Sequence, residues 1–425
     1  MQRRKFLLAT AAGVSTAGLF GCGGGVDAAA GQEVGTPGPS PSPNPTPAPG
    51  PNPVPAPPPA TTNGSLYVVD YQANAGIAAA GSPVPMFWQS SYTTKDGTLI
   101  EWGTGDHNQF GDNGVREFNP LTGKQSYIYP NNNGSVDVQQ YDNQQYWYVP
   151  RIDSLVIPGR KAYSRSTGRW SNVVGTGAGD LIRPNSGVSL YSFQNDYNGH
   201  QAWSGYLDCG VIISGGPGGD NTALQKMWIV VPGAGVGSSP QPYIVSERTM
   251  PASVGGASPS KLVGRDGCCF LREYVYWVGG GETVSESATP HFFRMKITNH
   301  LTSTSAAMEI ERLPDAPAAF KFGLLRADPN IDGLLCVTDR GVFAYDVPGR
   351  TWIVVTPSAY ANEFNVPPAK GLMPYGSLGD FIDTSGGQTL RRFYFRPGIN
   401  HAWDYSGTYG DVLYKRFRSI KLARR

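Results

Sequence analysis

The feature that most constrains this chain is a hairpin pattern that recurs along it. In "KAYSRSTGRWSNVV" Tyr163 stands seven residues before Trp170, and in "FAYDVPGRTWIVV" Tyr345 stands seven residues before Trp352. An aromatic-bearing strand also precedes the Thr-Gly turn of "REFNPLTGKQSYIYP". Turns built on Pro, Thr and Gly between β-branched and aromatic runs are typical of antiparallel hairpins. The chain therefore repeats one β unit.

A second type of strand lies upstream of these hairpins and sets the period. Its runs are β-branched and aromatic and end at glycine: "TLIEWGTG", "SLVIPG", "GVIISGG", "YVYWVGGG", "GLLCVTDRG" and "RFYFRPG". They recur roughly every 56 to 64 residues, which indicates a repeat architecture rather than a single wound sheet. Each period holds four short strands. We therefore predict an all-β, six-bladed β-propeller of four-stranded antiparallel blades, with seven blades as the alternative.

One further strand precedes the first complete unit. We expect "SLYVVDY", residues 65–71, to complete the last blade beside the C-terminal "VLYKRF" and so close the ring. The alternative is an extra strand or a seventh, partial blade. No long apolar stripe of helical period occurs, and Gly and Pro are too dense for helices.

The unit resembles the kelch repeat of the galactose-oxidase-like propellers. The resemblance rests on the Gly-Gly of "YVYWVGGG" and on the hairpins "YSRSTGRW" and "YDVPGRTW", and it covers roughly residue 65 to the C-terminus. Gly-Gly is lost in the first, second, fifth and sixth units, and the unit is longer than the usual kelch period. In that family the glycines allow tight packing and the aromatics fill space between blades. The resemblance therefore implies a fold and no reaction.

The N-terminal residues predict export and a lipid anchor. Residues 1–21 read as a signal peptide in which Arg3 and Arg4 of "QRRKFLL" resemble a twin-arginine signal. "LFGC" resembles a bacterial lipobox, which implies cleavage before Cys22 and acylation of its thiol; a simple cleaved signal is the alternative. Residues 22–64 are a Pro-rich tether of polyproline II type. Gly23 favours the outer membrane over retention at the inner one, so we expect a protein that faces the periplasm or the cell surface.

The remaining domain, residues 65–425, is nearly neutral. The chain has 34 Lys and Arg against 32 Asp and Glu, and three of the basic residues lie in the signal. This balance argues against a nucleic-acid partner. We expect a monomer that meets the membrane only through its lipid.

Long loops predict binding of a glycan or of an envelope protein. The blade-joining loop "PNNNGSVDVQQYDNQQYW" is rich in Asn, Gln, Asp and Tyr, whose side chains suit sugar hydroxyls and sugar rings as well as protein surfaces. The alternative is that these loops are polar because they face water. The candidate ligand-binding residues are Trp102, His107, Tyr148, Arg151, Trp203 and Arg265.

The loop "GDHNQFGDNG" is a candidate calcium site. It carries four oxygen donors at close spacing: Asp106, Asn108, Asp112 and Asn113. The spacing does not match an EF-hand loop, which ends on Glu. The alternative is a turn whose Asp and Asn side chains cap their own backbone. We predict no cofactor, with calcium as the only alternative at this loop.

A carbohydrate-active enzyme is the alternative function. A copper-radical oxidase needs clustered His and Tyr ligands, but the five histidines form no close pair, so we do not expect copper. A glycoside hydrolase needs two carboxylates across a channel. The acidic candidates on or near inner strands are Asp153, Asp208, Asp266 and Asp328, with Arg151, Arg265 and Arg326 nearby. The alternative is that these Arg and Asp residues pair and seal the channel wall. No catalytic residue is predicted.

Overall fold

A computed structural model describes seventeen stretches of the chain. They are residues 66–81, 91–106, 109–130, 146–157, 161–172, 182–184, 200–213, 225–232, 243–260, 267–279, 290–303, 305–317, 324–338, 341–364, 379–383, 390–396 and 415–425. The chain divides into Met1–Pro55 and Ala56–Arg425, and all described residues lie in the second unit. The predicted signal, Cys22 and the whole of the predicted tether lie outside the described residues. Within the described stretches, no helix is long and apolar enough to cross a membrane.

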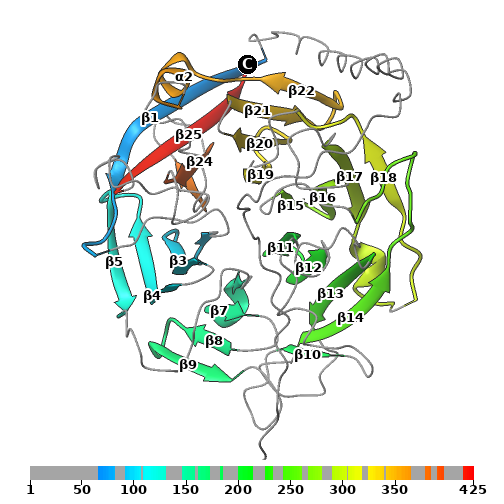
Figure 1. Cartoon of the computed structure of the whole chain (residues 1–425), viewed down its shortest axis with the longest axis horizontal. Coiled ribbons are helices and arrows are strands. Elements are labelled where there is room, and N and C mark those ends of the chain that lie inside the picture. Colours follow the sequence, from blue (N-terminus) through cyan, green and yellow to red (C-terminus); the bar gives the residue numbers. More distant parts are fainter. Residues whose placement is uncertain are drawn as a thin grey trace, which may run out of the picture. The chain divides into compact units, whose positions relative to one another are not determined.

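The largest sheet joins the two ends of the domain. Its eight strands have the order β2-β3-β4-β5-β1-β25-β24-β23. Figure 1 shows β1 beside β25. A single parallel pair, Ile77 with Lys124, joins the two halves of this sheet, and all other pairings within it are antiparallel. The strands are β1 (Tyr67–Ile77), β2 (Tyr92–Thr93), β3 (Leu99–Asp106), β4 (Gln109–Asn119), β5 (Lys124–Tyr129), β23 (Gly379–Asp383), β24 (Leu390–Phe395) and β25 (Arg416–Arg424).

Two further sheets follow in chain order. One has the order β6-β7-β8-β9 and the other β10-β14-β13-β12-β11, in which β10 runs parallel to β14. Their strands are β6 (Trp147–Val149), β7 (Ser154–Ile157), β8 (Lys161–Ser164), β9 (Arg169–Asn172), β10 (Ile182–Pro184), β11 (His200–Ser204), β12 (Cys209–Ile213), β13 (Lys226–Pro232) and β14 (Tyr243–Thr249).

The last two sheets each contain four consecutive antiparallel strands. They are β15 (Cys268–Leu271), β16 (Tyr274–Gly279), β17 (His291–Lys296), β18 (Ile310–Leu313), then β19 (Leu324–Asp328), β20 (Gly333–Thr338), β21 (Gly341–Asp346) and β22 (Thr351–Val354). The described helices are short: two 3-10 turns, Pro150–Ile152 and Thr298–His300, and one α-helix, α2 (Ser358–Phe364). The four strands predicted for the fourth unit and the four predicted for the fifth are confirmed.

The predicted aromatic hairpins are confirmed as the outer strand pairs of their sheets. Tyr345 of β21 lies opposite Trp352 of β22, and their ring centroids are 5.0 Å apart. Tyr163 of β8 lies opposite Trp170 of β9 at 5.4 Å. Both rings of the first pair also contact Phe292 of the preceding sheet. The repeated aromatics therefore fill space between neighbouring sheets.

The first described strand pairs with the last one, as the sequence predicts. β1 runs antiparallel to β25, with Tyr67 opposite Arg424 and Tyr71 opposite Ile420. The Tyr67 hydroxyl donates to Asp346 of the preceding sheet at 3.2 Å. The ends of the domain are thus held together by main-chain hydrogen bonds that span nearly the whole chain.

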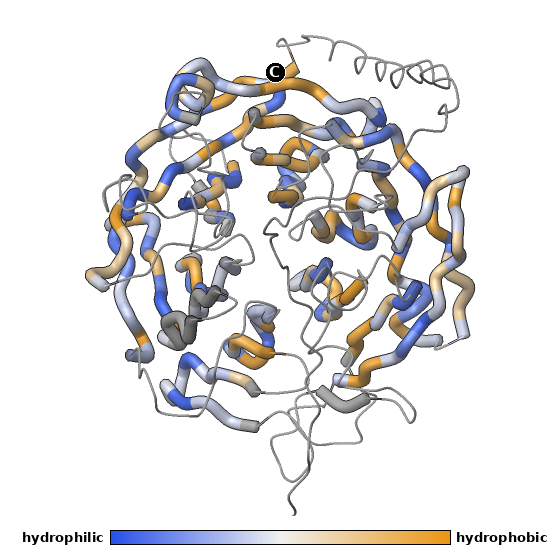
Figure 2. The backbone as a smooth tube through the Cα atoms, in the orientation of Figure 1, coloured by the Kyte–Doolittle hydropathy of each residue, from blue (hydrophilic) through white to orange (hydrophobic). Residues whose placement is uncertain are grey.

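Hydrophobic residues are frequent on the inner parts of the sheets, where the second strands β7, β12 and β20 lie (Figures 1 and 2). Every residue of β7, β12 and β20 is buried. Continuous apolar runs are typical of strands that are covered on both faces, and these strands pack against the neighbouring sheets on either side. The outer strand β22 is only partly buried. Apolar clusters link each sheet to the next in a closed series, which gives an all-β fold of the β-propeller kind.

Candidate functional site

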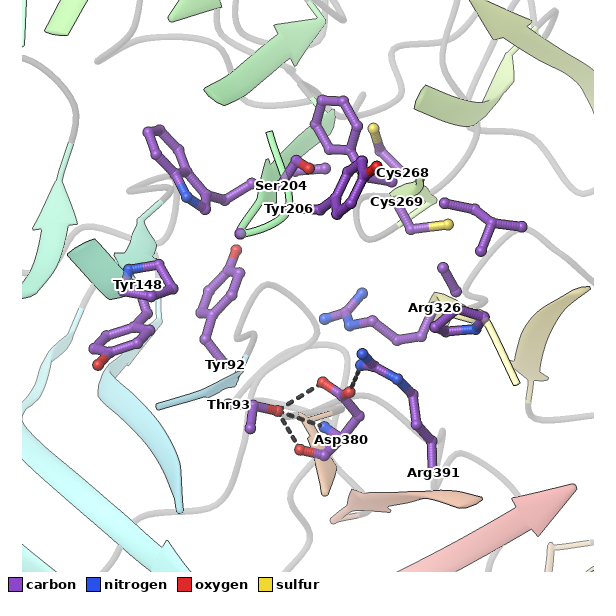
Figure 3. A pocket seen from close by; sticks show the side chains of 18 of the residues that line it. Tyr92, Thr93, Tyr148, Ser204, Tyr206, Cys268, Cys269, Arg326, Asp380 and Arg391 are labelled. Atoms are coloured by element: carbon purple, nitrogen blue, oxygen red, sulfur yellow. Dashed lines mark hydrogen bonds and ion pairs between the residues drawn. The ribbon is translucent and has the colours of Figure 1, made fainter. Parts of the chain in front are cut away.

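The first strands of successive sheets surround a central cavity. β2 contacts β6, β6 contacts β11, β11 contacts β15, and β15 contacts β19. β23 contacts β2 at the other end of this series. The cavity has a volume of about 460 Å³ and is lined from all six of these strands, from β24 and from the adjoining turns (Figure 3). The fold therefore brings residues from six distant segments to one place.

Aromatic side chains form one part of the cavity wall. Tyr92 meets Tyr146 edge to face at 5.6 Å, which fixes the position of its ring. Trp203 lies between Trp147 at 5.4 Å and Tyr243 at 5.2 Å. Tyr206, in the turn from β11 to β12, lines the cavity and is 79% exposed. A ring that lines a cavity yet remains open to water stands at its mouth.

Charged side chains form another part of the wall. Arg391 of β24 makes an ion pair with Asp380 of β23, and the Thr93 hydroxyl lies 2.6 Å from Asp380 Oδ1. Arg326 points into the cavity from β19, toward Tyr92 (Figure 3). One of its N–H groups donates to the carbonyl oxygen of Leu325 at 2.8 Å. Burial lowers the pKa of Arg391 from its usual value, and the nearby charge of Asp328 opposes that shift.

Asp328 is a fully buried carboxyl group at the end of β19. Its Oδ1 accepts the backbone N–H of Asn330 at 3.1 Å, whereas its Oδ2 has no hydrogen-bond partner. Burial raises the pKa of Asp328 to about 6, although the Asn330 N–H and the Arg391 charge both lower it. A buried carboxyl group with one unsatisfied oxygen is costly when ionised.

Arg–Asp pairs join neighbouring sheets at the turns that follow the first strands. Arg151 lies 2.8 Å from Asp208 and stacks on the ring of Tyr243, with its guanidinium carbon 5.0 Å from the ring centroid. Asp153 accepts hydrogen bonds from Tyr148 at 2.7 Å and from Arg165 at 2.8 Å. Although burial raises the pKa of Asp153, these hydrogen bonds outweigh it and lower the pKa below its usual value. The predicted pairing of Arg and Asp residues therefore holds for Arg151 with Asp208, whereas Asp153 pairs with Arg165.

Asp380 is the one carboxylate among the described lining residues, and Arg391 and Thr93 already hold it. Glycoside hydrolysis uses two carboxyl groups on either side of the scissile bond. Among the described residues, no group of three or more His, Cys, Asp and Glu side chains could hold a metal ion.

Three of the six candidate ligand-binding residues come together. Tyr148 and Trp203 both line the cavity, and Arg151 contacts Tyr243, whose ring packs against Trp203. Trp102 is fully buried, and its ring packs against Tyr146 and Trp170, so it belongs to the core between two sheets. His107 and Arg265 lie outside the described residues.

The candidate calcium loop is a strand hairpin in its main chain. β3 extends to Asp106 and β4 begins at Gln109, and Asp112 lies opposite Thr104. The chain is therefore paired where we predicted an open loop. Asn108 and the side chains of Asp106, Asp112 and Asn113 lie outside the described residues, as do the long polar loops predicted to bind a ligand.

Sequence reasoning missed most residues of the wall, among them Tyr92, Tyr206, Asp380 and Arg391. Tyr92 and Asp380 belong to β2 and β23, which are too short or too polar to give a strand pattern. Tyr206 stands in the turn "SGYLDCG", whose only signal is an aromatic residue between Gly and Asp. Arg326 was placed on an inner strand from its sequence position, and the structure agrees.

No protein-family model matches the chain, and no curated protein matches it in sequence. Solved structures that align with it include regucalcin, a calcium-binding protein from Agrobacterium tumefaciens, with 11% identity, a TM-score of 0.40 and coverage of 83% of this chain and 97% of that one. An α-L-arabinofuranosidase from Fusarium graminearum in complex with an iminosugar inhibitor has 11% identity, a TM-score of 0.38 and coverage of 84% and 97%. An oligogalacturonate lyase in complex with manganese has 12% identity, a TM-score of 0.37 and coverage of 84% and 97%. Likenesses this weak carry no argument about activity.

Proposed function

We propose that residues 65–425 form a six-bladed propeller of kelch type. The eight-stranded sheet divides at the single Ile77–Lys124 pair into β2-β3-β4-β5 and β23-β24-β25-β1. Each half then has the same four-strand order, from the cavity outward, as the other sheets. β10 is an addition to the outer edge of the third blade. The cross-strand Tyr–Trp pairs support the kelch resemblance, because they occupy the space between blades.

The function that we propose is carbohydrate binding in the central cavity of an exported, lipid-anchored protein. Acylation at Cys22 after a signal that carries Arg3 and Arg4 would anchor the chain, and the Pro-rich tether would hold the propeller away from the membrane. Transfer of sugar rings from water to an aromatic wall is favourable, while hydroxyl and guanidinium groups orient the sugar.

The observation that carries this proposal is the composition of the cavity wall. Tyr206 presents an exposed ring at the mouth, and the half-buried Tyr92 lines the same cavity. Thr93, Ser204 and Gln201 supply polar groups along the same wall. A cavity of about 460 Å³ is large enough for a small saccharide, because ligand pockets commonly measure about 300–1,000 Å³.

The test is binding of the purified protein to an array of immobilised glycans, followed by titration of any glycan retained. Loss of one aromatic stacking contact is expected to weaken binding about five- to tenfold in Tyr206→Ala. Leu121→Ala is the matched control, because Leu121 is equally exposed, at 81%, but stands in the outer turn between β4 and β5. Retention of no glycan, or equal affinities for wild type and Tyr206→Ala, would contradict the proposal.

A further inference from the structure

We propose that the ligand is a chain of sugars rather than a single sugar, and that a sugar at the mouth of the cavity stacks on Tyr206. This inference rests on the proposed carbohydrate binding and adds a second subsite to it. The subsite lies where the sheet that begins with β11 meets the sheet that begins with β15. Figure 3 shows Tyr206 on the same side of the cavity as Cys268 and Cys269 of β15.

Turns of equal length join the first strand to the second in three of the sheets, and they can be compared position by position. They are residues 150–153, 205–208 and 329–332. Each ends on an aspartate with a positive φ, of 46°, 51° and 50° in turn: Asp153, Asp208 and Asp332. Because the turns agree in length and in this conformation, their second positions are equivalent. These positions hold Arg151, Tyr206 and Asn330. The position is therefore polar in two of the turns and aromatic in the third.

Ion pairs join the first turns of neighbouring sheets at three boundaries. Lys95, in the turn between β2 and β3, lies 3.1 Å from Asp153, and Arg151 lies 2.8 Å from Asp208. Arg272, in the turn between β15 and β16, lies 3.3 Å from Asp332. Among the described residues, no ion pair joins the turn of Tyr206 to the next turn, which is only residues 272–273 and contains no aspartate. The boundary beside Tyr206 therefore lacks the polar bridge that the other three have.

The cavity reaches the turns at this same boundary. Tyr206 lines it, together with Phe270 and Arg272 from the next sheet, whereas the equivalent residues Arg151 and Asn330 are not among its described lining residues. Isolated exposed apolar side chains are common on protein surfaces. Tyr206 is a stronger signal, because it is 79% exposed, replaces a polar residue of the repeated turn and lies on the cavity wall. A departure from the repeat at a cavity mouth marks a position with a function in binding.

The aromatic side chains of the wall differ in how much of their surface is open to water. Tyr92 and Trp203 are half-buried, so a sugar that contacts them lies within the cavity. The open part of the Tyr206 ring is covered by a group that extends beyond the cavity, and the half-buried Phe270 adds apolar surface beside it. Arg272 is already paired, so this contact requires no charge on the ligand. A second, neutral sugar ring of the same chain meets these conditions.

The experiment compares the monosaccharides glucose, xylose and mannose with their β-1,4-linked disaccharides. Each is titrated into the purified protein by calorimetry. For the sugar that binds, we expect the disaccharide to bind about five- to tenfold more tightly than the monosaccharide, as one additional aromatic stacking contact provides. In Tyr206→Ala the disaccharide should bind no more tightly than the monosaccharide. Tyr206→Phe should keep the gain, because the ring and not the hydroxyl makes the contact.

Asn330→Ala is the matched control, because Asn330 occupies the equivalent position of an equal turn, is exposed and lies outside the cavity. It should keep the gain. Equal affinities of wild type for a monosaccharide and its disaccharide would overturn the second subsite and leave carbohydrate binding intact. A gain that survives in Tyr206→Ala would overturn the role of Tyr206. Binding of none of these sugars would contradict both this inference and the carbohydrate proposal. Thermal denaturation of each variant separates loss of binding from loss of folding.

Discussion

Asp328→Asn should make the stability of this protein less sensitive to pH. The folded state raises the pKa of Asp328 to about 6 from an ordinary value of 3.8, because the carboxyl group is fully buried at the end of β19. The charged group that acts on it is Arg391 from β24, which opposes the shift without cancelling it. Folding therefore holds this proton more tightly than the unfolded chain does.

The sign and size of the effect follow from that shift. A group with a raised pKa stabilises the fold fully below its unfolded pKa, and the contribution is lost as the pH rises through the folded value. A shift of about two units corresponds to about 3 kcal/mol, of which about 2 kcal/mol is lost between about pH 4 and pH 7.5. The amide of Asn keeps the oxygen that accepts the Asn330 N–H but does not ionise.

The assay is urea denaturation of wild type and Asp328→Asn at about pH 4 and pH 7.5. Relative to wild type, the variant should gain about 2 kcal/mol in its free energy of unfolding at the higher pH. The quantity measured is the difference in the free energy of unfolding between the variant and wild type at each pH. This difference is used because Asp153 and Glu311, whose pKa values are lowered, make both proteins more stable as the pH rises, which is opposite to the effect of Asp328. Asp332→Asn, in the same turn but partly exposed, is the control. A difference that stays constant with pH for Asp328→Asn would refute the reasoning.

Three further substitutions or deletions test the fold. Arg165→Gln should lower the free energy of unfolding, measured by urea denaturation, by about 2–4 kcal/mol, because Arg165 is 11% exposed and bridges Asp153 and Glu117. The control Lys226→Gln breaks a more exposed pair with Glu247 and should lower it by less than about 0.5 kcal/mol; equal losses in the two variants would argue against the bridge. Tyr345→Phe should be neutral or stabilising by up to about 1 kcal/mol, because the Tyr345 hydroxyl is buried with no hydrogen-bond partner, and a clear loss of stability would show that the hydroxyl is bonded. Deletion of the residues before Asn74 removes most of β1 and exposes the edge of β25, so size-exclusion chromatography should show that the truncated chains associate with one another. A truncated monomer as stable as the full chain would contradict closure of the ring by β1.

The outer parts of each blade could be predicted because their signals are local. A cross-strand pair such as Tyr345 and Trp352 is separated by one tight turn, so its spacing in the sequence is fixed by the hairpin geometry. The second strands could be predicted because both of their faces are covered, which requires a continuous apolar run. The strand count predicted that residues 65–71 pair with the C-terminal strand and close the ring, and β1 does pair with β25.

The candidate site could be predicted only in part because the cavity is built from long-range neighbours. Trp102 and Trp203 are both tryptophans near loops, but Trp102 stands on a second strand and is buried, whereas Trp203 stands on a first strand and reaches the cavity. Residue type alone does not separate these two cases. The position of the strand within the blade does, and that position is known only once the register of the repeats is known.

The length of the first strands explains both the success with Arg326 and the failure with Tyr92. In β11 the half-buried Gln201 and Trp203 line the cavity together with the buried Ala202 and Ser204. Side chains from both faces of this strand therefore reach the cavity, and alternation alone does not mark the residues of the wall. β19 is five residues long and carries Arg326 among apolar neighbours, so it could be found. β2 is only two residues long, so its sequence gives no strand pattern. The cavity wall is therefore predictable to the extent that each first strand is long enough to be recognised.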